Sequence, residues 1–175
     1  MNDLEKLGIK YETDKIGKHH YLPVYYDLFK DRQNEIKKVL EIGIGEGASL
    51  RMWNDFFPNA MIYGADIEPE RYIKERDYPR IEIIDCDQSS KESLEFLIGE
   101  TNSDIDLLID DGSHKPEDQL FTCLIMMEML EENIVYVIED VVDENIMSYL
   151  TKYDSQLIRV GKRYDDQLII VRYKK

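Results

Sequence analysis

The sequence has few cysteines and no long hydrophobic segment. Its two cysteines, Cys86 and Cys123, form neither a CxxC motif nor a Cys/His spacing typical of a zinc site. We therefore expect both to be reduced core thiols, which suits a cytoplasmic protein. No apolar run approaches the roughly 18 residues that a membrane-spanning helix needs, and the N-terminal stretch is polar from its first residues. The sequence thus predicts neither export nor a membrane partner.

Basic residues are also scarce. Lys and Arg number 22 against 37 Asp and Glu, which gives a formal net charge of -15. Such a charge repels a phosphate backbone, and no basic stripe with interleaved aromatic residues offsets it. Nucleic acid is therefore not an expected partner, whereas small cationic or metal-bridged ligands remain compatible with this charge.

Repeats and Gly/Ser/Pro-rich tracts are absent as well. Hydrophobic residues make up 43% of the chain and charged residues 34%, a balance typical of a globular fold. A chain of 175 residues is long enough for one well-packed domain. We expect residues 1–175 to form a single domain, with an N-terminal cap segment over residues 1–35 and a core over residues 38–173.

Short apolar runs alternate with longer amphipathic ones from residue 38 onward. Their length and β-branched content predict buried strands over Lys38–Ile42, Met61–Asp66, Ile81–Asp85, Ile105–Asp110 and Ile134–Glu139. The stretches between them predict helices over Ser49–Phe57, Glu68–Arg76, Lys91–Ile98 and Pro116–Leu130. Strands that alternate with helices are typical of a parallel sheet covered on both faces.

The two ends of the chain depart from this alternation. Gln156–Val160 and Gln167–Tyr173 are separated by a short polar link, which predicts an antiparallel hairpin. Residues 1–35 hold a polar loop and then a helix that begins near Leu22. The predicted fold is therefore α/β, with five parallel strands, a C-terminal antiparallel hairpin and helices on both faces.

Glycines follow the first predicted strand, in EIGIGEGAS. Gly43, Gly45 and Ala48 spell GxGxxA, a variant of the dinucleotide fingerprint, and Asp66 lies near the spacing of a ribose-binding acid. Glycine allows the backbone to approach a ligand closely, and the helix that follows offers free N–H groups. Nicotinamide, flavin and S-adenosylmethionine sites all use this pattern, and a turn that merely closes a βα unit is the alternative.

Every predicted parallel strand ends in a glycine cluster or an acid. Ligands of open α/β sheets bind outside the carboxyl ends of the strands, so these residues predict a site. Beyond the glycines, they are Asp66, Asp87 with Gln88, Asp110 and Asp111 with His114, and Glu139 with Asp140. Adjacent side chains of a strand point to opposite faces, so we expect only one of Asp110 and Asp111 to ligate a metal. The alternative for His114 is that it only caps the start of a helix or packs there.

Four segments, in order along the chain, resemble a known family. EIGIGEG, GADI and DCDQ resemble the class I S-adenosylmethionine-dependent methyltransferases, whose Rossmann-like sheet has five parallel strands and an antiparallel hairpin. More narrowly, YETDKIGKHHYLPVYYDLF, VLEIGIGEGASLRMWNDFFPNAMIYGADI, LLIDDGSH and YVIEDV are similar to sugar O-methyltransferases of the mycinamicin and macrocin type. The resemblance implies S-adenosylmethionine as the cofactor and a sugar hydroxyl as the acceptor.

The resemblance also implies roles for individual residues. Gly43 and Gly45 hold the methionine portion of the cofactor, Asp66 its ribose, and Asp87 with Gln88 the adenine side. Further residues expected at the cofactor are Ile67, Asp110, Thr13 and Lys15. Residues expected at the acceptor are Asp14, His19, Tyr21 and Glu139. A solvated loop is the alternative for the histidines and the lysine of the N-terminal segment.

Catalytic roles follow from the motif DDGSH and the acids after the fifth strand. The resemblance implies that Asp111 and Asp140 ligate Mg²⁺, beside the acceptor, and that His114 acts as the general base. A sugar hydroxyl is a poor nucleophile near neutral pH, so methyl transfer needs deprotonation and in-line positioning. No motif places a third metal ligand. EDVVDEN lacks the histidine that the family has here, so part of the acceptor site is expected to differ.

The acceptor itself is predicted only through the resemblance. The chain lacks the large extra domain of macrolide-modifying relatives, which favours a nucleotide-linked sugar, such as a GDP-heptose destined for capsular polysaccharide. The exposed edge of the predicted hairpin permits a homodimer. A nicotinamide-dependent oxidoreductase and a non-catalytic cofactor-binding protein with a methyltransferase fold are the alternatives.

Overall fold

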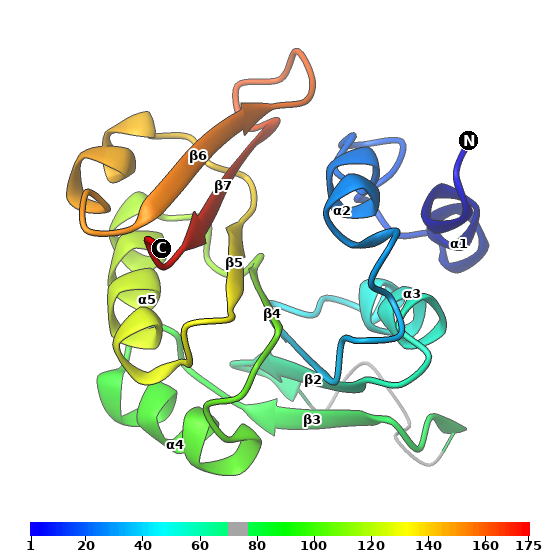
Figure 1. The fold of residues 1–175 in the computed structure, drawn as a ribbon, viewed down its shortest axis with the longest axis horizontal. Coiled ribbons are helices and arrows are strands. Elements are labelled where there is room, and N and C mark those ends of the chain that lie inside the picture. Colours follow the sequence, from blue (N-terminus) through cyan, green and yellow to red (C-terminus); the bar gives the residue numbers. More distant parts are fainter. Residues whose placement is uncertain (70–76) are drawn as a thin grey trace.

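The computed structural model describes residues 1–69 and 77–175, which form one mixed sheet with helices on both faces (Figure 1). The strands are β1 (Lys38–Ile42), β2 (Met61–Asp66), β3 (Ile81–Asp85), β4 (Leu107–Asp110), β5 (Val135–Ile138), β6 (Asp154–Arg159) and β7 (Gln167–Arg172). The helices are α1 (Asp3–Tyr11), α2 (Leu22–Phe29), α3 (Ala48–Phe56), α4 (Lys91–Thr101), α5 (Pro116–Met129) and the 3-10 helix η3 (Glu144–Tyr149). The helix predicted over Glu68–Arg76 falls mostly on residues 70–76, outside the described residues.

The strand order is β3-β2-β1-β4-β5-β7-β6. Strands β1 to β5 are parallel, and β7 runs antiparallel to both β5 and β6. This confirms the predicted five parallel strands and the C-terminal hairpin. The order reverses between β1 and β4, and in open α/β sheets such a reversal opens a crevice at the carboxyl ends of the strands. The predicted site residues follow those ends.

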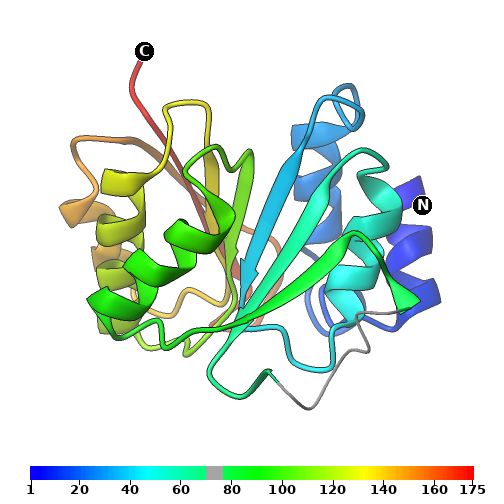
Figure 2. The same ribbon diagram turned by 90° about the horizontal axis from the view of Figure 1, so that it is seen from below.

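Two hydrophobic clusters fill the two sides of the sheet. Helices α4 and α5 pack on one face together with η3, and α1, α2 and α3 pack on the other (Figure 2). Successive residues of β1 go to opposite clusters, Val39 to the side of α1–α3 and Leu40 to the side of α4 and α5. The polar side chains at the strand ends alternate in the same way, so that neighbouring residues lie on opposite sides of the sheet. Within the described ranges, every helix is too short or too polar to cross a membrane.

The structure adds α1 and η3, which the sequence patterns did not predict. Helix α1 begins with a capping box, since the Asn2 side chain accepts the N–H of Glu5 at 2.8 Å and the Glu5 carboxylate accepts that of Asn2 at 2.6 Å. An acid three residues after Asn is the sequence signal for this cap. Strand β4 begins at Leu107, two residues later than predicted, and the Asp106 carboxylate just before it accepts the N–H groups of Lys37 and Lys38.

Candidate active site

The loop between β1 and α3 runs against the end of β4. Gly43 has φ +84°, and a Cβ built there would lie 2.1 Å from the main-chain oxygen of Asp111, so only glycine fits. Gly45 has φ +48° and open space around it. Helix α3 then begins after Gly47 without a side-chain cap in the described structure. Its first N–H groups and the positive end of its dipole therefore suit an anionic ligand group.

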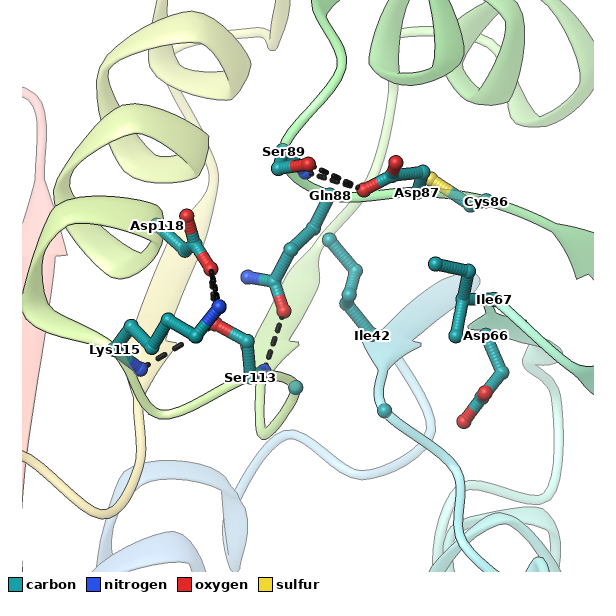
Figure 3. Close-up of a pocket in the computed structure, with 12 residues that line it drawn as sticks. Ile42, Asp66, Ile67, Cys86, Asp87, Gln88, Ser89, Ser113, Lys115 and Asp118 are labelled. Carbon is teal, nitrogen blue, oxygen red and sulfur yellow. Dashed lines mark hydrogen bonds and ion pairs between the residues drawn. The ribbon is translucent and has the colours of Figure 1, made fainter.

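A pocket of about 340 Å³ opens beside this loop at the carboxyl ends of β1 to β4 (Figure 3). We call it the β-end pocket. Its lining includes five of the residues predicted to bind the cofactor, namely Gly43, Asp66, Ile67, Asp87 and Gln88. The Ile67 side chain is 64% exposed, which is unusual for isoleucine and leaves its apolar surface free for a flat ligand group.

Two carboxylates fix the main chain of the β-end pocket. The Asp66 side chain accepts the N–H of Ile44 at 3.0 Å and so ties the end of β2 to the glycine loop. The Asp87 side chain accepts the hydroxyl of Ser89 at 2.7 Å and its N–H at 2.9 Å. These hydrogen bonds lower the pKa of Asp87. Both acids are therefore held in place by local contacts.

Asp110 is fully buried on the face of α4 and α5, within a neutral network of side chains. Gln88 Nε2 donates to Asp110 Oδ1 at 3.0 Å and to Thr122 Oγ1 at 3.1 Å, and Tyr136 donates to Asp110 Oδ2 at 3.2 Å. Gln88 Oε1 accepts the N–H of Ser113 at 2.6 Å. Burial raises the pKa of Asp110 to about 7, against the effect of these hydrogen bonds. We call these residues the Asp110 network; it supports the wall of the β-end pocket.

Asp111 points to the opposite face, where it joins a charged cluster. Lys15 Nζ lies 2.6 Å from Asp111 Oδ2, 2.6 Å from Glu139 Oε2 and 3.1 Å from Glu41 Oε1. Tyr25 donates to Glu139 Oε1 at 2.5 Å. Only 1% of the Lys15 side chain is exposed. In this Lys15 cluster one buried ammonium group therefore faces three carboxylates.

The charges of the Lys15 cluster do not balance. Burial lowers the pKa of Lys15, but the three carboxylates outweigh it and hold that pKa well above its ordinary value. Burial raises the pKa of Asp111, but Lys15 and His114 outweigh it and bring it to about 2. Burial and the neighbouring carboxylates raise the pKa of Glu139. The raised pKa of Glu139 reflects the crowding of acids around one ammonium group, and a further cation here would favour their ionised forms.

His114 and Asp140 lie at the rim of the Lys15 cluster. His114 Nε2 lies 3.1 Å from Asp111 Oδ1, and His114 Nδ1 lies 3.6 Å from Asp140 Oδ2. The hydrogen bond with Asp111 is the main cause of a raised pKa for His114. His114 has φ +58° and Asp140 has φ +52°, a left-handed backbone that costs non-glycine residues about 1–2 kcal/mol. Such strain is typical of functional positions.

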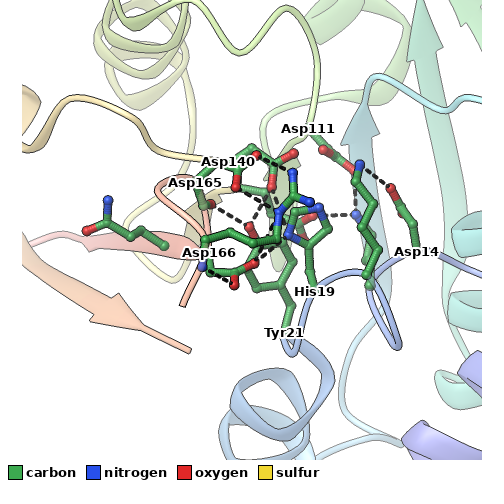
Figure 4. Close-up of polar contacts among 12 residues, drawn as sticks. Asp14, His19, Tyr21, Asp111, Asp140, Asp165 and Asp166 are labelled. Atoms are coloured by element: carbon green, nitrogen blue, oxygen red, sulfur yellow. Dashed lines mark hydrogen bonds and ion pairs between the residues drawn. The ribbon is translucent and has the colours of Figure 1, made fainter. Parts of the chain in front are cut away.

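The N-terminal segment and the hairpin turn between β6 and β7 meet at the same rim (Figure 4). Tyr21 donates to Asp140 Oδ1 at 2.5 Å and to the main-chain oxygen of Asp165 at 3.0 Å. His19 Nδ1 lies 2.9 Å from Asp166 Oδ1 and 3.6 Å from Asp140 Oδ1. The His19 and Tyr21 rings stack with centroids 4.9 Å apart. The two rings therefore hold Asp140 in its strained position.

Comparisons with known proteins agree with this fold and this site. No family model matches the chain. The mycinamicin VI 2''-O-methyltransferase of Micromonospora griseorubida and the demethylmacrocin O-methyltransferase of Streptomyces fradiae are each 37% identical over 79% of this chain and 36% of their own length. The MycE methyltransferase from the mycinamycin biosynthetic pathway, solved in complex with Mg and SAH, superposes with a TM-score of 0.79 and 27% identity, over 98% of this chain and 54% of that chain.

The chain has the class I methyltransferase fold and is related to the macrolide sugar O-methyltransferases. This confirms the resemblance drawn from the sequence segments. The chain spans about a third to a half of the length of these relatives. A putative caffeoyl-CoA O-methyltransferase from Staphylococcus aureus, 16% identical with a TM-score of 0.69, shares the fold alone.

The structure of the chain brings many of the predicted residues together beside the glycine loop. Thr13 and Asp14 line a second pocket, of about 330 Å³, with Gly45, Asp111 and His114. We call it the glycine-loop pocket. It joins predicted cofactor, acceptor and catalytic residues in one hollow.

Other predicted residues line neither of these two pockets. Lys15 and Glu139 are buried in the charged cluster, and Asp110 in its own network. Their contacts with cofactor or acceptor stay predictions, and their observed contacts are with other side chains. Reasoning from the sequence missed Glu41, although a lone acid in the apolar strand KVLEI was a signal. It also missed the acids of the hairpin turn at residues 165–166.

Proposed function

We propose that the chain is an S-adenosylmethionine-dependent O-methyltransferase that methylates a sugar hydroxyl. The observation that carries the proposal is the glycine-loop pocket, in which Gly45 lies with Asp111 and His114. A cofactor site and a base that share one hollow can bring a methyl donor and a hydroxyl together. The relationship to sugar O-methyltransferases, one of them solved with SAH, supports the same reaction.

The chain's own residues divide the cofactor site into two ends. In this proposal, the β-end pocket holds the adenosine, with Asp66 toward the ribose hydroxyls and Asp87 toward the adenine. Gly43 and Gly45 allow the main chain to approach the methionine part, and the uncapped start of α3 faces its carboxylate. S-adenosylmethionine supplies an electrophilic methyl group on a sulfonium that becomes a neutral thioether.

His114 accepts the proton of the acceptor hydroxyl in this proposal. Its Nε2 is engaged by Asp111, which orients the ring and leaves Nδ1 for the hydroxyl proton. The hydroxyl oxygen then forms the new bond to the methyl carbon. Asp111 and Asp140 stabilise the charged form of His114 and raise its pKa, which makes the ring a stronger base; only its neutral form accepts the proton. General bases of this kind contribute about 10²–10⁴-fold to a rate.

Asp111 and Asp140 also fit a divalent cation. Ligand atoms of Asp111, His114 and Asp140 all lie within 4.8 Å of one another, and the acids beside them outnumber the single ammonium group. We propose that Asp111 and Asp140 hold Mg²⁺, which prefers carboxylate oxygens. When bound there, Mg²⁺ would make an adjacent sugar hydroxyl more acidic.

The finer identity of the acceptor is a separate proposal. A nucleotide-linked sugar, such as a GDP-heptose of capsular polysaccharide biosynthesis, is the acceptor that the sequence predicts. Self-association through the exposed β6 edge of the sheet is likewise proposed. Chromatographic size at several concentrations tests the second proposal, and a panel of sugar nucleotides tests the first.

Binding of S-adenosylhomocysteine tests the main proposal. We expect isothermal titration of the full chain to give saturable binding, and we expect Asp66→Ala to weaken it, because Asp66 also ties the glycine loop in place. A Glu82→Gln variant is the matched control, because Glu82 lies in β3 and lines neither the β-end pocket nor the glycine-loop pocket. NADH is the control ligand, because GxGxxA is also used by nicotinamide enzymes. Binding of NADH without binding of S-adenosylhomocysteine would contradict the proposal.

A further inference from the structure

A third hollow lies at the rim of the site, and nothing in the proposed reaction uses it. It is open, measures about 550 Å³, and is lined by Lys18, His20, Val160, Lys162, Arg163 and Asp166 with one glycine. We call it the basic hollow. Four basic side chains surround this opening, which is unusual for a chain whose net charge is -15. An excess of positive charge in one concave place favours an anionic ligand.

Two polar side chains of the basic hollow have no partner among the described residues. Neither Lys162 nor His20 makes a side-chain hydrogen bond or ion pair within the part of the chain that the structure describes. Lys18 has one, an exposed pair with Asp14 at 3.3 Å. Exposed pairs of this kind contribute little, so Lys18 can turn to a ligand at small cost. Three side chains of the basic hollow are therefore available to an anion.

The hairpin turn that carries Lys162 and Arg163 is held in a fixed shape. Arg163 Nε and Nη2 each lie 3.0 Å from an oxygen of Asp165, and Asp166 Oδ2 accepts the N–H of Arg163 at 2.9 Å. A Cβ at Gly161 would lie 2.0 Å from the same Asp166 oxygen, so the turn closes directly on that carboxylate. The main chain that carries Lys162 is therefore fixed, which lowers the entropic cost of presenting this residue to a ligand.

The basic hollow adjoins the acceptor side of the site. Lys18 lines it, and the Asp14 partner of Lys18 lines the glycine-loop pocket. Asp166 also lines it and contacts His19, which lies 3.6 Å from Asp140 at the reaction centre (Figure 4). The β-end pocket and the basic hollow share no lining residue. The anion is thus expected on the acceptor and not on the cofactor.

We propose that the basic hollow binds the diphosphate of a nucleotide-linked sugar acceptor. The inference rests on the proposed function and specifies its acceptor. Phosphate oxygens accept several charge-assisted hydrogen bonds, which Lys18, Lys162 and His20 are placed to donate. Anchoring of the diphosphate at Lys18 directs the attached sugar past Asp14 into the glycine-loop pocket, which His114 also lines. A neutral glycoside carries the same hydroxyls and leaves the basic hollow unfilled.

Titration of the full chain with inorganic pyrophosphate tests the hollow directly. We expect binding that weakens with rising salt, because exposed charges are screened. Lys18→Ala and Lys162→Ala should each weaken it about tenfold, as expected for loss of one charge-assisted hydrogen bond. Lys91→Ala removes an equal charge on α4, and Tyr164→Ala is a neutral change in the same hairpin turn. Both controls should bind pyrophosphate like the wild type.

Turnover of matched acceptors identifies the source of the phosphate. We expect KM for a sugar nucleotide to rise about tenfold in Lys162→Ala, with KM for the corresponding methyl glycoside and the affinity for S-adenosylhomocysteine unchanged. Equal KM values for the two acceptors in the wild type, both insensitive to Lys162→Ala, would overturn the inference. Pyrophosphate binding without any such difference indicates a site for free phosphate and also overturns it. Loss of S-adenosylhomocysteine binding bears only on the proposed function, since pyrophosphate binding is measured without cofactor.

Discussion

Adjacent residues in the sequence, Asp110 and Asp111, belong to two very different polar networks on opposite faces of the sheet. The Asp110 network consists of amide and hydroxyl groups around a single carboxyl group, which they satisfy with hydrogen bonds. The Lys15 cluster places three acidic groups around one buried ammonium group, and burial with mutual repulsion of the acids raises the pKa of Glu139. The first arrangement supports the wall of the β-end pocket, whereas the second favours the binding of a further cation. Chemistry is therefore expected on the Lys15 side.

Removal of the Lys15 charge is expected to have the largest effect. Lys15→Met leaves three carboxylates without their buried partner, and we expect a loss of about 3–5 kcal/mol in the free energy of unfolding. Tyr136→Phe removes one hydrogen bond, that to Asp110, and should cost about 1 kcal/mol. Urea denaturation monitored by the single tryptophan measures both. Similar losses for the two variants would contradict the difference between the networks.

Catalysis should depend on one network far more than on the other. We expect His114→Ala to lower kcat for methyl transfer about 100-fold or more, as for loss of a general base, without a change in S-adenosylhomocysteine affinity. Asp110→Asn is nearly isosteric and should leave kcat within about threefold, since the observed contacts of Asp110 are with the side chains of its own network. Initial rates with saturating cofactor give both values. A His114→Ala variant that turns over like the wild type would remove the imidazole from the reaction.

A divalent cation should distinguish the networks without any assay of activity. Mg²⁺ at about 100 times its Kd should stabilise the folded chain by about 2.7 kcal/mol if it binds only the native state. This stabilisation is measured as an increase in the thermal midpoint of unfolding. Asp140→Asn should abolish the increase, whereas Asp118→Asn, which alters a carboxylate beside the β-end pocket, should retain it. If the thermal midpoint still increases in Asp140→Asn, the cation binds elsewhere. If exhaustive chelation has no effect on turnover, the cation has no catalytic role.

An exposed counterpart of the Lys15 cluster should show the smallest effect. Lys10 and Tyr11 on α1 both donate to Asp55 Oδ2 on α3 at 2.7 Å. Asp55→Asn should cost less than about 1 kcal/mol, because solvent screens such pairs. Partial burial raises the pKa of Asp55, but the bonds from Lys10 and Tyr11 outweigh it and lower the pKa overall. The contribution is therefore present above about pH 4 and lost as the pH falls through the lowered pKa. Unfolding curves from pH 3 to 7 measure it, and a cost that is equal at both ends would contradict this account.

Periodicity in the sequence predicted the positions of the strand-end residues well. Because side chains alternate along a strand, the opposite directions of Asp110 and Asp111 were predictable from their adjacent positions alone. The parallel order of β1 to β5 followed from the alternation of strands with helices, and the polar link before Gln167 predicted the hairpin. Local pattern therefore determined both the sheet and the edge at which the site lies.

Contacts between distant segments were not predictable from the same patterns. Lys15 lies 96 residues from Asp111 and 124 from Glu139, and no local period relates such positions. The resemblance marked Lys15 as a functional residue, but only the packing of the N-terminal segment shows that its ammonium group neutralises buried acids. Asp166 is a similar case, because its contact with His19 depends on how the hairpin turn folds back over the sheet.

The left-handed backbone at His114 and Asp140 bears on any attempt to make this protein more thermostable. Glycine at either position would relieve a strain of about 1 kcal/mol and is the substitution that a search for stabilising changes would select. It would also remove an imidazole or a carboxylate from the reaction centre. In these two turns the sequence of greatest heat resistance and the sequence of greatest activity are expected to differ, so thermostabilising changes belong in other parts of the fold.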